Sequence, residues 1–444
     1  MSLQLTPDEI ETSLLKFIEL IRFPTISNSA VVNGSYQACG TWLLNQLKEI
    51  GLHSFILEES LENKPIVIAT WEGSDPSLPC LLLNSHYDVV PVVLDKWTVP
   101  AFDGLRQNGK IYGRGTQDMK CVCMQYITAI AKLKSLGDFK PIRTIHLSFI
   151  PDEEIGGIDG MNILLTSDWF ASVKLELALD EGLANESNDM SIFYGERLPW
   201  WVKITAQGNT GHASRFIDGT AVEQLLAVTS KAMEFRKEQK DILHGVNQHA
   251  GCSHAVAVKK KATLGDVTSM NITMLRSGVQ ANGEDIVNVI PPTAEAGFDI
   301  RISPNMETSE MLSKLDLWCE EVTRNTPGLN KKEGHGVSWS FVRDPLYSHN
   351  ITSTDPAVNQ WYALFEQTLL TQHNIKLVPE VFPAATDSRF LRALGYKAFG
   401  FSPMRNIRIM LHENDEFIEE AVYAEGCQVY VTLIRALSMQ GSFV

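Results

Sequence analysis

The sequence has no long apolar run, little basic charge and no pattern of paired cysteines. No uninterrupted apolar stretch approaches the about 18 residues that a membrane-spanning helix needs. Lys and Arg total 38 against 53 Asp and Glu, which gives a formal net charge of -15 at pH 7. Because phosphate backbones and anionic lipids bind to basic surfaces, we expect neither nucleic acid nor membrane as a partner.

The seven cysteines do not form a disulfide framework. Their number is odd and their spacing is irregular, so reduced thiols are the simpler interpretation. Cys121 and Cys123 lie two apart on an expected helix, where they point to different faces and do not form a zinc pair. Residues 1–8 show no basic segment followed by an apolar one, so we expect no secretory signal and a cytoplasmic location.

Strand-like and helical segments alternate along most of the chain. At about 150 residues per domain, 444 residues predict two or three domains. Apolar runs predict strands at 66–71, 81–85, 145–150, 177–179 and 397–401. Helical spacing predicts a helix capped by Thr6 and ended by Pro24, and further helices over 35–50 and 119–136. This alternation predicts an α/β fold with a mostly parallel, doubly wound sheet.

The middle of the chain has a different pattern. Strands are predicted at 201–205, 269–275, 295–302 and 337–342, with helices at 220–235 and 309–323. This is the β-α-β-β-α-β order of a small ferredoxin-like unit. We therefore expect an inserted α+β domain at 195–345 within an α/β domain built from 1–194 and 346–444.

Polar residues with metal-binding side chains follow several of the apolar strands. His86 and Asp88 are two apart, so both project from one face and Asp88 can orient the His86 ring. Asp118 lies at an expected helix start, and Asp180, Glu181 and His412 occur in similar segments. Because ligands of open α/β sheets gather at the carboxyl ends of strands, these segments are expected to converge. Alone, however, a histidine is more often structural, and Asp118 is equally compatible with a helix N-cap.

Glu153 and Glu154 are adjacent at the end of a predicted buried strand. Two such carboxylates repel each other unless a cation lies between them. A pair of adjacent glutamates is, however, more often exposed to solvent at the edge of a structure. A metal ion would take one as a ligand and leave the other to transfer protons. Taken together, this ordered set of His, Asp and Glu matches a two-zinc hydrolase, in which one carboxylate bridges two ions that share a water.

Several motifs give the chain a family resemblance that spans nearly its whole length. They include S-H-Y-D-V-V-P, Y-G-R-G-T-Q-D-M-K, P-D-E-E-I-G-G and A-L-D-E-G, in this order. The chain resembles the aminoacylase/carboxypeptidase family of co-catalytic zinc amidohydrolases. The motifs E-R-x-P-W-W, G-H-A-S-R-F, N-V-I-P, P-A-A-T-D-S-R, G-F-S-P-M and L-H-E-N-D-E resemble its cytosolic aminoacylase branch.

The resemblance implies a fold, an activity and partners. The fold is a two-zinc aminopeptidase/carboxypeptidase-like catalytic domain with an inserted ferredoxin-like lid that mediates dimerisation. The activity is hydrolysis of N-acyl-L-amino acids by a homodimer with two zinc ions per subunit. The alternative on the same scaffold is a dipeptidase or carboxypeptidase, and the alternative of another class is a non-catalytic binding protein.

The resemblance also assigns roles to individual residues of the metal site. His86 and Glu154 resemble the ligands of one zinc, Glu181 and His412 those of the other, and Asp118 the bridging carboxylate. Glu153 resembles the general base and Asp88 the carboxylate that supports His86. The A-L-D-E-G motif favours Glu181 over Asp180 as the ligand.

The inserted domain carries three further residues that match the family. His212 resembles the lid histidine that stabilises the oxyanion in the partner subunit's site. Asn288 matches the lid asparagine, and Arg301 an arginine that binds the substrate carboxylate, a task suited to guanidinium. Two insertions depart from the usual aminoacylase, at 237–266 and at 281–285. In the first, His244, His249, Cys252 and His254 are interpreted as a loop rather than a metal site.

Overall fold

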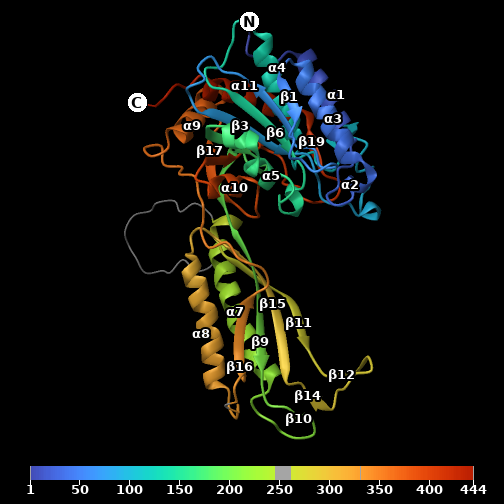
Figure 1. Cartoon of the computed structure of the whole chain (residues 1–444), viewed down its shortest axis with the longest axis vertical. Helices are drawn as coiled ribbons and strands as arrows, with labels where there is room; N and C mark the ends of the chain where they lie inside the picture. Colours follow the sequence, from blue (N-terminus) through green and yellow to red (C-terminus); the bar gives the residue numbers. More distant parts are fainter. Residues whose placement is uncertain (1, 246–261, 331, 444) are drawn as a thin grey trace. The chain divides into compact units, whose positions relative to one another are not determined.

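The chain is divided into two compact units. The structure, a computed structural model, describes residues 2–245, 262–330 and 332–443, and Figure 1 shows their helices and strands. Unit 1 comprises Met1–Gly195, Asn350–Glu380 and Thr386–Val444, and unit 2 comprises Glu196–His349 and Val381–Ala385. The expected division at residues 195 and 345 did not place Val381–Ala385 in the inserted part.

Unit 1 is built on an eight-stranded sheet with the order β1-β2-β6-β3-β7-β18-β8-β17. The strands are β1 (His53–Ile56), β2 (Val67–Trp71), β3 (Cys80–His86), β6 (Ile145–Ile150), β7 (Leu175–Asp180), β8 (Met190–Glu196), β17 (Leu377–Phe382) and β18 (Lys397–Gly400). The four neighbours β6, β3, β7 and β18 are parallel, as expected. The sheet as a whole is mixed, because β1 and β2 form an antiparallel hairpin and β2 also pairs antiparallel with β6.

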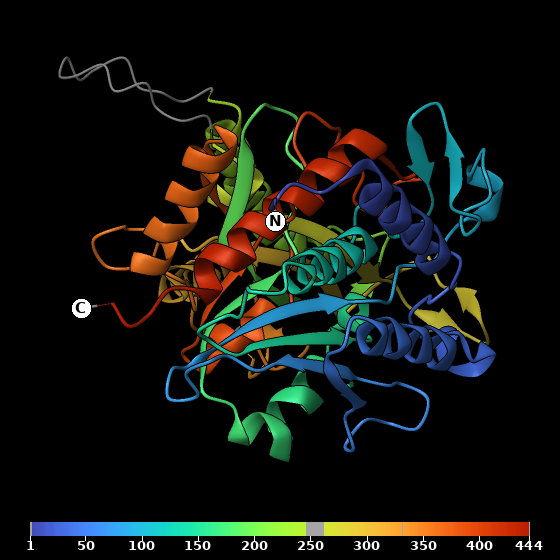
Figure 2. The ribbon, with the colours of Figure 1, turned by 90° about the horizontal axis from the view of Figure 1, so that it is seen from above.

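Helices cover both faces of this sheet (Figure 2). They are α1 (Pro7–Ile21), α2 (Ala30–Asn33), α3 (Ser35–Glu49), α4 (Lys120–Ser135), α5 (Met161–Thr166), α6 (Asp168–Ser172), α9 (Gln360–His373), α10 (Ser388–Ala393) and α11 (Glu420–Ser438). Leu81 and Leu83 belong to the core beneath α1, α4 and α11, whereas Leu82 belongs to the core beneath α5, α6 and α10. Alternate side chains of one strand thus bury opposite faces, which confirms the predicted α/β class.

Smaller elements complete unit 1. A separate three-stranded sheet has the order β19-β5-β4, and three-residue 3₁₀ turns occur at η1 and η2. Their bounds are β4 (Leu105–Gln107), β5 (Lys110–Tyr112), β19 (Phe417–Glu419), η1 (Leu94–Lys96) and η2 (Glu153–Ile155). The predicted cap of α1 is present, since the Thr6 side chain accepts the Glu9 N–H and the Glu9 carboxylate accepts the Thr6 N–H. Such a capping box satisfies two of the helix's free N–H groups.

Unit 2 has the predicted β-α-β-β-α-β order. Its main elements are β9 (Leu198–Gln207), α7 (Ala221–Leu243), β11 (Ser269–Ser277), β15 (Thr293–Ile302), α8 (Thr308–Asn325) and β16 (Gly336–Phe341). The strands form an antiparallel sheet in the order β11-β15-β9-β16, and α7 and α8 lie along it (Figure 1). Its core contains apolar side chains from these strands and both helices.

Short elements lie at the ends of the unit 2 strands. They are β10 (Gly211–His212), which pairs with β14 (Val289–Ile290), β12 (Gln280–Ala281), β13 (Glu284–Asp285) and η3 (Leu264–Asp266). The insertion expected at 281–285 is a hairpin of β12 and β13 whose turn is Asn282-Gly283, both at positive φ. Asn-Gly is favoured in such turns because both positions need a left-handed backbone.

Of the four residues His244, His249, Cys252 and His254, the last three lie outside the described residues, and His244 is the C-cap that follows α7. Among the helices that the structure describes, none is long and apolar enough to cross a membrane.

Candidate metal centre

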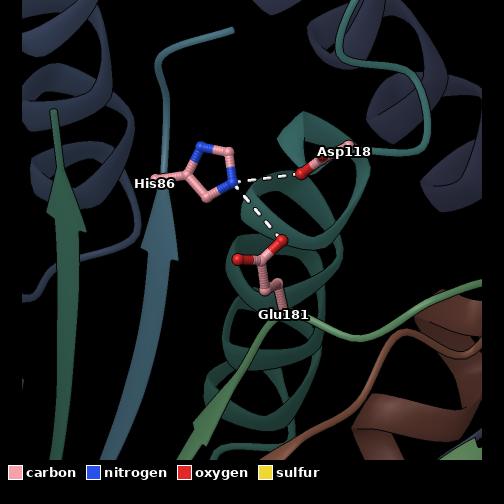
Figure 3. A group of neighbouring side chains, drawn as sticks. All are labelled: His86, Asp118 and Glu181. Atoms are coloured by element: carbon pink, nitrogen blue, oxygen red, sulfur yellow. Dashed lines mark hydrogen bonds and ion pairs between the residues drawn. The ribbon is translucent and has the colours of Figure 1, made fainter. Parts of the chain in front are cut away.

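One ligand group forms where parallel strands of unit 1 end. His86 is the last residue of β3 and Glu181 directly follows β7, its parallel neighbour, so both side chains leave the sheet at the same edge. The His86 Nε2 atom lies 3.1 Å from Asp118 Oδ1 and 3.6 Å from Glu181 Oε2 (Figure 3). All three residues are buried. One imidazole nitrogen and two carboxylates therefore face a common point.

A second group forms on the other side of Asp118. Glu154 belongs to η2, the turn after β6, and His412 lies in the loop before β19. The His412 Nε2 atom is 3.1 Å from Glu154 Oε2 and 3.3 Å from Asp118 Oδ2. Asp118 thus directs one carboxylate oxygen to each group, the arrangement of a carboxylate that bridges two metal ions.

The grouping of these ligands differs from the expected one. The sequence analysis placed His86 with Glu154, and Glu181 with His412. The structure groups His86 with Glu181, and Glu154 with His412, so that prediction was wrong. Motif order indicates candidate ligands but not the side of Asp118 from which each one approaches, and here the β3–β7 pairing places Glu181 beside His86.

Two alternatives from the sequence are resolved by local contacts. Asp118 is not the N-cap of α4, because that position is Met119, which makes no side-chain cap hydrogen bond. Both carboxylate oxygens of Asp180 are engaged in other hydrogen bonds. They accept from Asn84 Nδ2 at 2.9 Å and from the N–H and hydroxyl of Ser388, both at 2.8 Å. Glu181 is therefore the carboxylate of this pair that reaches the ligand group.

Asp88 connects His86 to the turn that carries both glutamates. The Nδ1 atom of His86 is 3.0 Å from the Asp88 carbonyl oxygen and 3.4 Å from its carboxylate. The same carboxylate accepts the N–H groups of Glu153 and Glu154, both at 3.2 Å, and the Ser27 hydroxyl at 2.7 Å. With Nδ1–H directed at Asp88, the lone pair of Nε2 is available to a metal.

Glu153 is buried beside the ligands but belongs to neither group of the described residues. Its Oε1 atom lies 4.0 Å from Nη1 of Arg389. Burial, together with the nearby Glu181 carboxylate, raises the pKa of Glu153 well above its ordinary value. A carboxyl group whose proton affinity is raised in this way is suited to accept and return a proton.

Carboxyl groups are crowded at this site. Burial and the adjacent Asp118 carboxylate raise the pKa of Glu154 to about 7, and the same two causes raise the pKa of Glu181 well above its ordinary value. Burial also disfavours the charge of Asp118, but hydrogen bonds from His412 and His86 lower its pKa. Crowded, buried carboxylates with imidazole nitrogens are donors that fit divalent zinc.

Comparison with known proteins identifies the family of this chain. The model of peptidase family M20/M25/M40 matches residues 82–436. The chain belongs to this family. The chain is 42% identical over 406 residues to "Aminoacylase-1" of Dictyostelium discoideum. This alignment covers 90% of this chain and 92% of that protein. It is 38% identical over 436 residues to "Aminoacylase-1" of Mus musculus, with 97% of both chains covered.

A solved structure shows the same M20 fold. Human carnosine dipeptidase 1 superposes with a TM-score of 0.67 at 15% identity, covering 97% of each chain. At this identity the likeness concerns the fold alone. The expected membership of the aminoacylase/carboxypeptidase family is confirmed by the sequence relatives.

The remaining predicted residues of this M20 chain lie in unit 2. His212 is exposed on β10, and its Nδ1 atom is 2.8 Å from the Ser214 hydroxyl. The Asn288 carbonyl accepts the Ala213 N–H at 2.8 Å, which ties it to the His212 strand. Arg301, on β15, pairs through Nε and Nη2 with the two carboxylate oxygens of Asp299, at 2.8 and 3.0 Å.

Glu416 is a positioning residue that the sequence analysis missed. It is buried, and its carboxylate accepts the Gln117 N–H at 2.7 Å, the Gly115 N–H at 3.1 Å and the Arg114 guanidinium at 2.8 Å. Arg114 also donates to the His412 carbonyl at 3.3 Å. Glu416 therefore joins the segment before Asp118 to the segment of His412. Its signal was the final glutamate of L-H-E-N-D-E.

Proposed function

We propose that this chain is a metal-dependent amidohydrolase that converts N-acyl-L-amino acids into a carboxylate and a free L-amino acid. The observation that carries the proposal is the shared Asp118 carboxylate between two ligand groups, with Glu153 beside them and outside both. Relatives named aminoacylase-1 that align over most of the chain support the same substrate class.

Two zinc ions per subunit are part of this proposal. Each group offers one imidazole nitrogen and two carboxylates, which leaves a position for water in a four-coordinate zinc site. When bound, such ions supply a water of lowered pKa and polarise the acyl carbonyl. His86, Asp118 and Glu181 would hold one ion, and Asp118, Glu154 and His412 the other.

The chain's own residues then move the protons and orient the substrate. Glu153 accepts a proton from the attacking water and returns it to the amide nitrogen as the C–N bond breaks. His212 donates a hydrogen bond to the oxyanion, together with Asn288. Since Asp299 takes Nε and Nη2 of Arg301, we assign the substrate carboxylate to Nη1.

The choice between an aminoacylase and a dipeptidase is tested by substrate comparison. We expect kcat/KM for N-acetylmethionine to exceed that for Ala and Gly dipeptides by at least about tenfold, because a free ammonium group at the acyl position needs a buried partner. Enzyme depleted of metal by a chelator provides the background rate for both substrates. Faster hydrolysis of the dipeptides would replace the aminoacylase assignment with the dipeptidase alternative.

A homodimer in the cytoplasm completes the proposal. Unit 2 contains His212, Asn288 and Arg301, whereas both ligand groups lie in unit 1. The exposed edge strands of the unit 2 sheet suit pairing with a second copy, by which His212 would act in the partner's site. The six cysteines that the structure describes are free thiols, which supports a reducing compartment.

Mixing two inactive variants tests whether His212 acts across the dimer. His212→Ala alone is expected to lower kcat about 10²- to 10³-fold with unchanged metal content, as for one oxyanion donor. After subunit exchange with Glu153→Gln, half of the dimers are mixed and half of their sites are intact, so activity should return to about a quarter of wild type. If exchange is demonstrated by tagged subunits and activity stays at the parental level, the trans assignment fails.

A further inference from the structure

The loop of residues 152–159 carries both Glu153 and Glu154 and has little regular structure of its own. Only η2 is helical within it, and Asp152, Gly156 and Gly157 have φ values of 64°, 109° and 68°. Glycine adopts this left-handed region without steric cost, whereas an aspartate does so less readily. Within the loop, the Gly156 N–H bonds to the Glu153 carbonyl and the Gly157 N–H to the Asp152 carbonyl, both at 2.8 Å. Contacts from outside the loop add to these backbone bonds.

Lys64 bonds to both ends of this loop. It belongs to the connection between β1 and β2, and its ammonium group contacts Asp152 Oδ2 and lies 2.7 Å from Asp159 Oδ2. The side chain of Lys64 is 14% exposed and that of Asp152 is 2% exposed. Tyr36 donates its hydroxyl to the other Asp152 oxygen at 2.7 Å. The Lys64 ammonium group thus bridges the carboxylates at the two ends of the 152–159 loop.

Other contacts hold the middle of the loop. Asp88 accepts the N–H groups of Glu153 and Glu154, and Arg389 donates Nη2 to the Gly156 carbonyl at 2.9 Å. Among the ion pairs of the described residues, the one at Asp159 is made by Lys64. Without Lys64, the loop keeps these contacts and its own backbone bonds but loses the bridge between the Asp152 and Asp159 carboxylates.

The two ligand groups depend on this loop to different extents. Glu154 is a member of the 152–159 loop, so the group of Asp118, Glu154 and His412 relies on its conformation. His86 and Glu181 lie at the ends of β3 and β7, where the sheet holds them. A displaced loop therefore disturbs one group directly and leaves the other in place.

We propose that Lys64 is a positioning residue that fixes the 152–159 loop, and thereby sets the position of Glu154 as a metal ligand and of Glu153 as the base. The assignment rests on the proposed two-metal amidohydrolase. Lys64 acts through two carboxylates that flank the glutamates, and its contacts are to Asp152 and Asp159. Loss of Lys64 should therefore first weaken binding of the ion that Asp118, Glu154 and His412 would hold.

The test counts zinc in Lys64→Met, which keeps the side-chain length and removes the charge. After equilibration in a zinc buffer and gel filtration, metal analysis should find about two zinc ions per wild-type subunit and close to one per variant subunit. We expect kcat for N-acetylmethionine to fall about 10- to 100-fold with KM changed less than about threefold, because a shift of about 1 Å in a positioned group costs rate more than binding.

Lys132→Met is the matched control. Lys132 also lies in unit 1, is 8% exposed and bonds to both carboxylate oxygens of Glu9 at 3.0 Å, but this pair joins α4 to α1. The control should retain two zinc ions and the wild-type kcat. Lys64→Arg should restore the second zinc, because a guanidinium group can also bridge two carboxylates. Asp159→Asn, at the more exposed end of the bridge, should give the one-zinc state with a smaller risk to folding.

Three results would overturn the proposal. They are two zinc ions in Lys64→Met with the wild-type kcat, loss of both ions together, and the same zinc count in Lys132→Met as in Lys64→Met. The zinc count does not depend on turnover. If the wild type bound two zinc ions and hydrolysed no N-acyl amino acid, the proposed function would fail while the count still decided the role of Lys64.

Discussion

Replacing Glu153 with glutamine should lower kcat about 10²- to 10⁴-fold and leave the metal content unchanged. The amide has the same shape as the carboxylate but cannot accept the proton of the attacking water. The backbone N–H of Glu153 still bonds to Asp88, so the turn is retained. Steady-state kinetics on N-acetylmethionine and metal analysis of the same sample measure the two quantities.

The control for this variant is Glu58→Gln, which changes an exposed glutamate of unit 1. It should have the wild-type kcat and metal content. A Glu153→Gln enzyme with near wild-type kcat would remove Glu153 from the base role. Loss of metal along with activity would instead assign it a part in metal binding, against the proposal.

Removing the bridging carboxylate should have an equally large effect by a different route. Asp118→Ala deletes the oxygen that faces His86 and the oxygen that faces His412, so both ligand groups lose a member at once. We expect metal content and activity to fall together, with kcat reduced at least about 10³-fold, because several kcal/mol of transition-state stabilisation depend on the ions. Metal analysis and circular dichroism on the same preparation separate metal loss from unfolding.

Asp118→Asn tests the same role with less change of shape, since it keeps one carbonyl oxygen and removes the negative charge. It is expected to bind fewer than two ions. Asp138→Ala, at an exposed position of unit 1, is the control and should retain both. Two zinc ions in Asp118→Ala, with wild-type thermal stability, would show that Asp118 is not the bridge.

Much of the fold follows from local patterns in the sequence. The strand predicted at 145–150 coincides with β6, and the capping box at Thr6 begins α1 as expected. Periodicity is informative here because buried strands and amphipathic helices each repeat their apolar residues at a fixed interval. The candidate ligands that the structure brings together were also predictable, since each one is a polar residue placed next to an apolar strand or in a motif of the family.

The three-dimensional relations among these residues were not accessible in the same way. Which oxygen of Asp118 faces which histidine depends on how the strands are ordered, and no local pattern records it. Lys64 lies 88 residues from Asp152, and Glu416 lies 299 residues from Gln117. The motif L-H-E-N-D-E includes Glu416 but does not indicate its contact with Gln117, and Lys64 belongs to no motif. The contacts of both positioning residues were therefore found only in the structure.

The place of β18 in the sheet has a consequence for biosynthesis. This strand lies between β7 and β8, although it follows every residue of unit 2 in the sequence. A nascent chain leaves the ribosome N-terminus first. All residues of unit 2 are therefore available to fold before β18 fills its place between β7 and β8. His412 emerges later still, after β18. Almost the whole polypeptide must therefore be synthesised before the second ligand group is complete, so uptake of the two proposed zinc ions would be a late step of maturation.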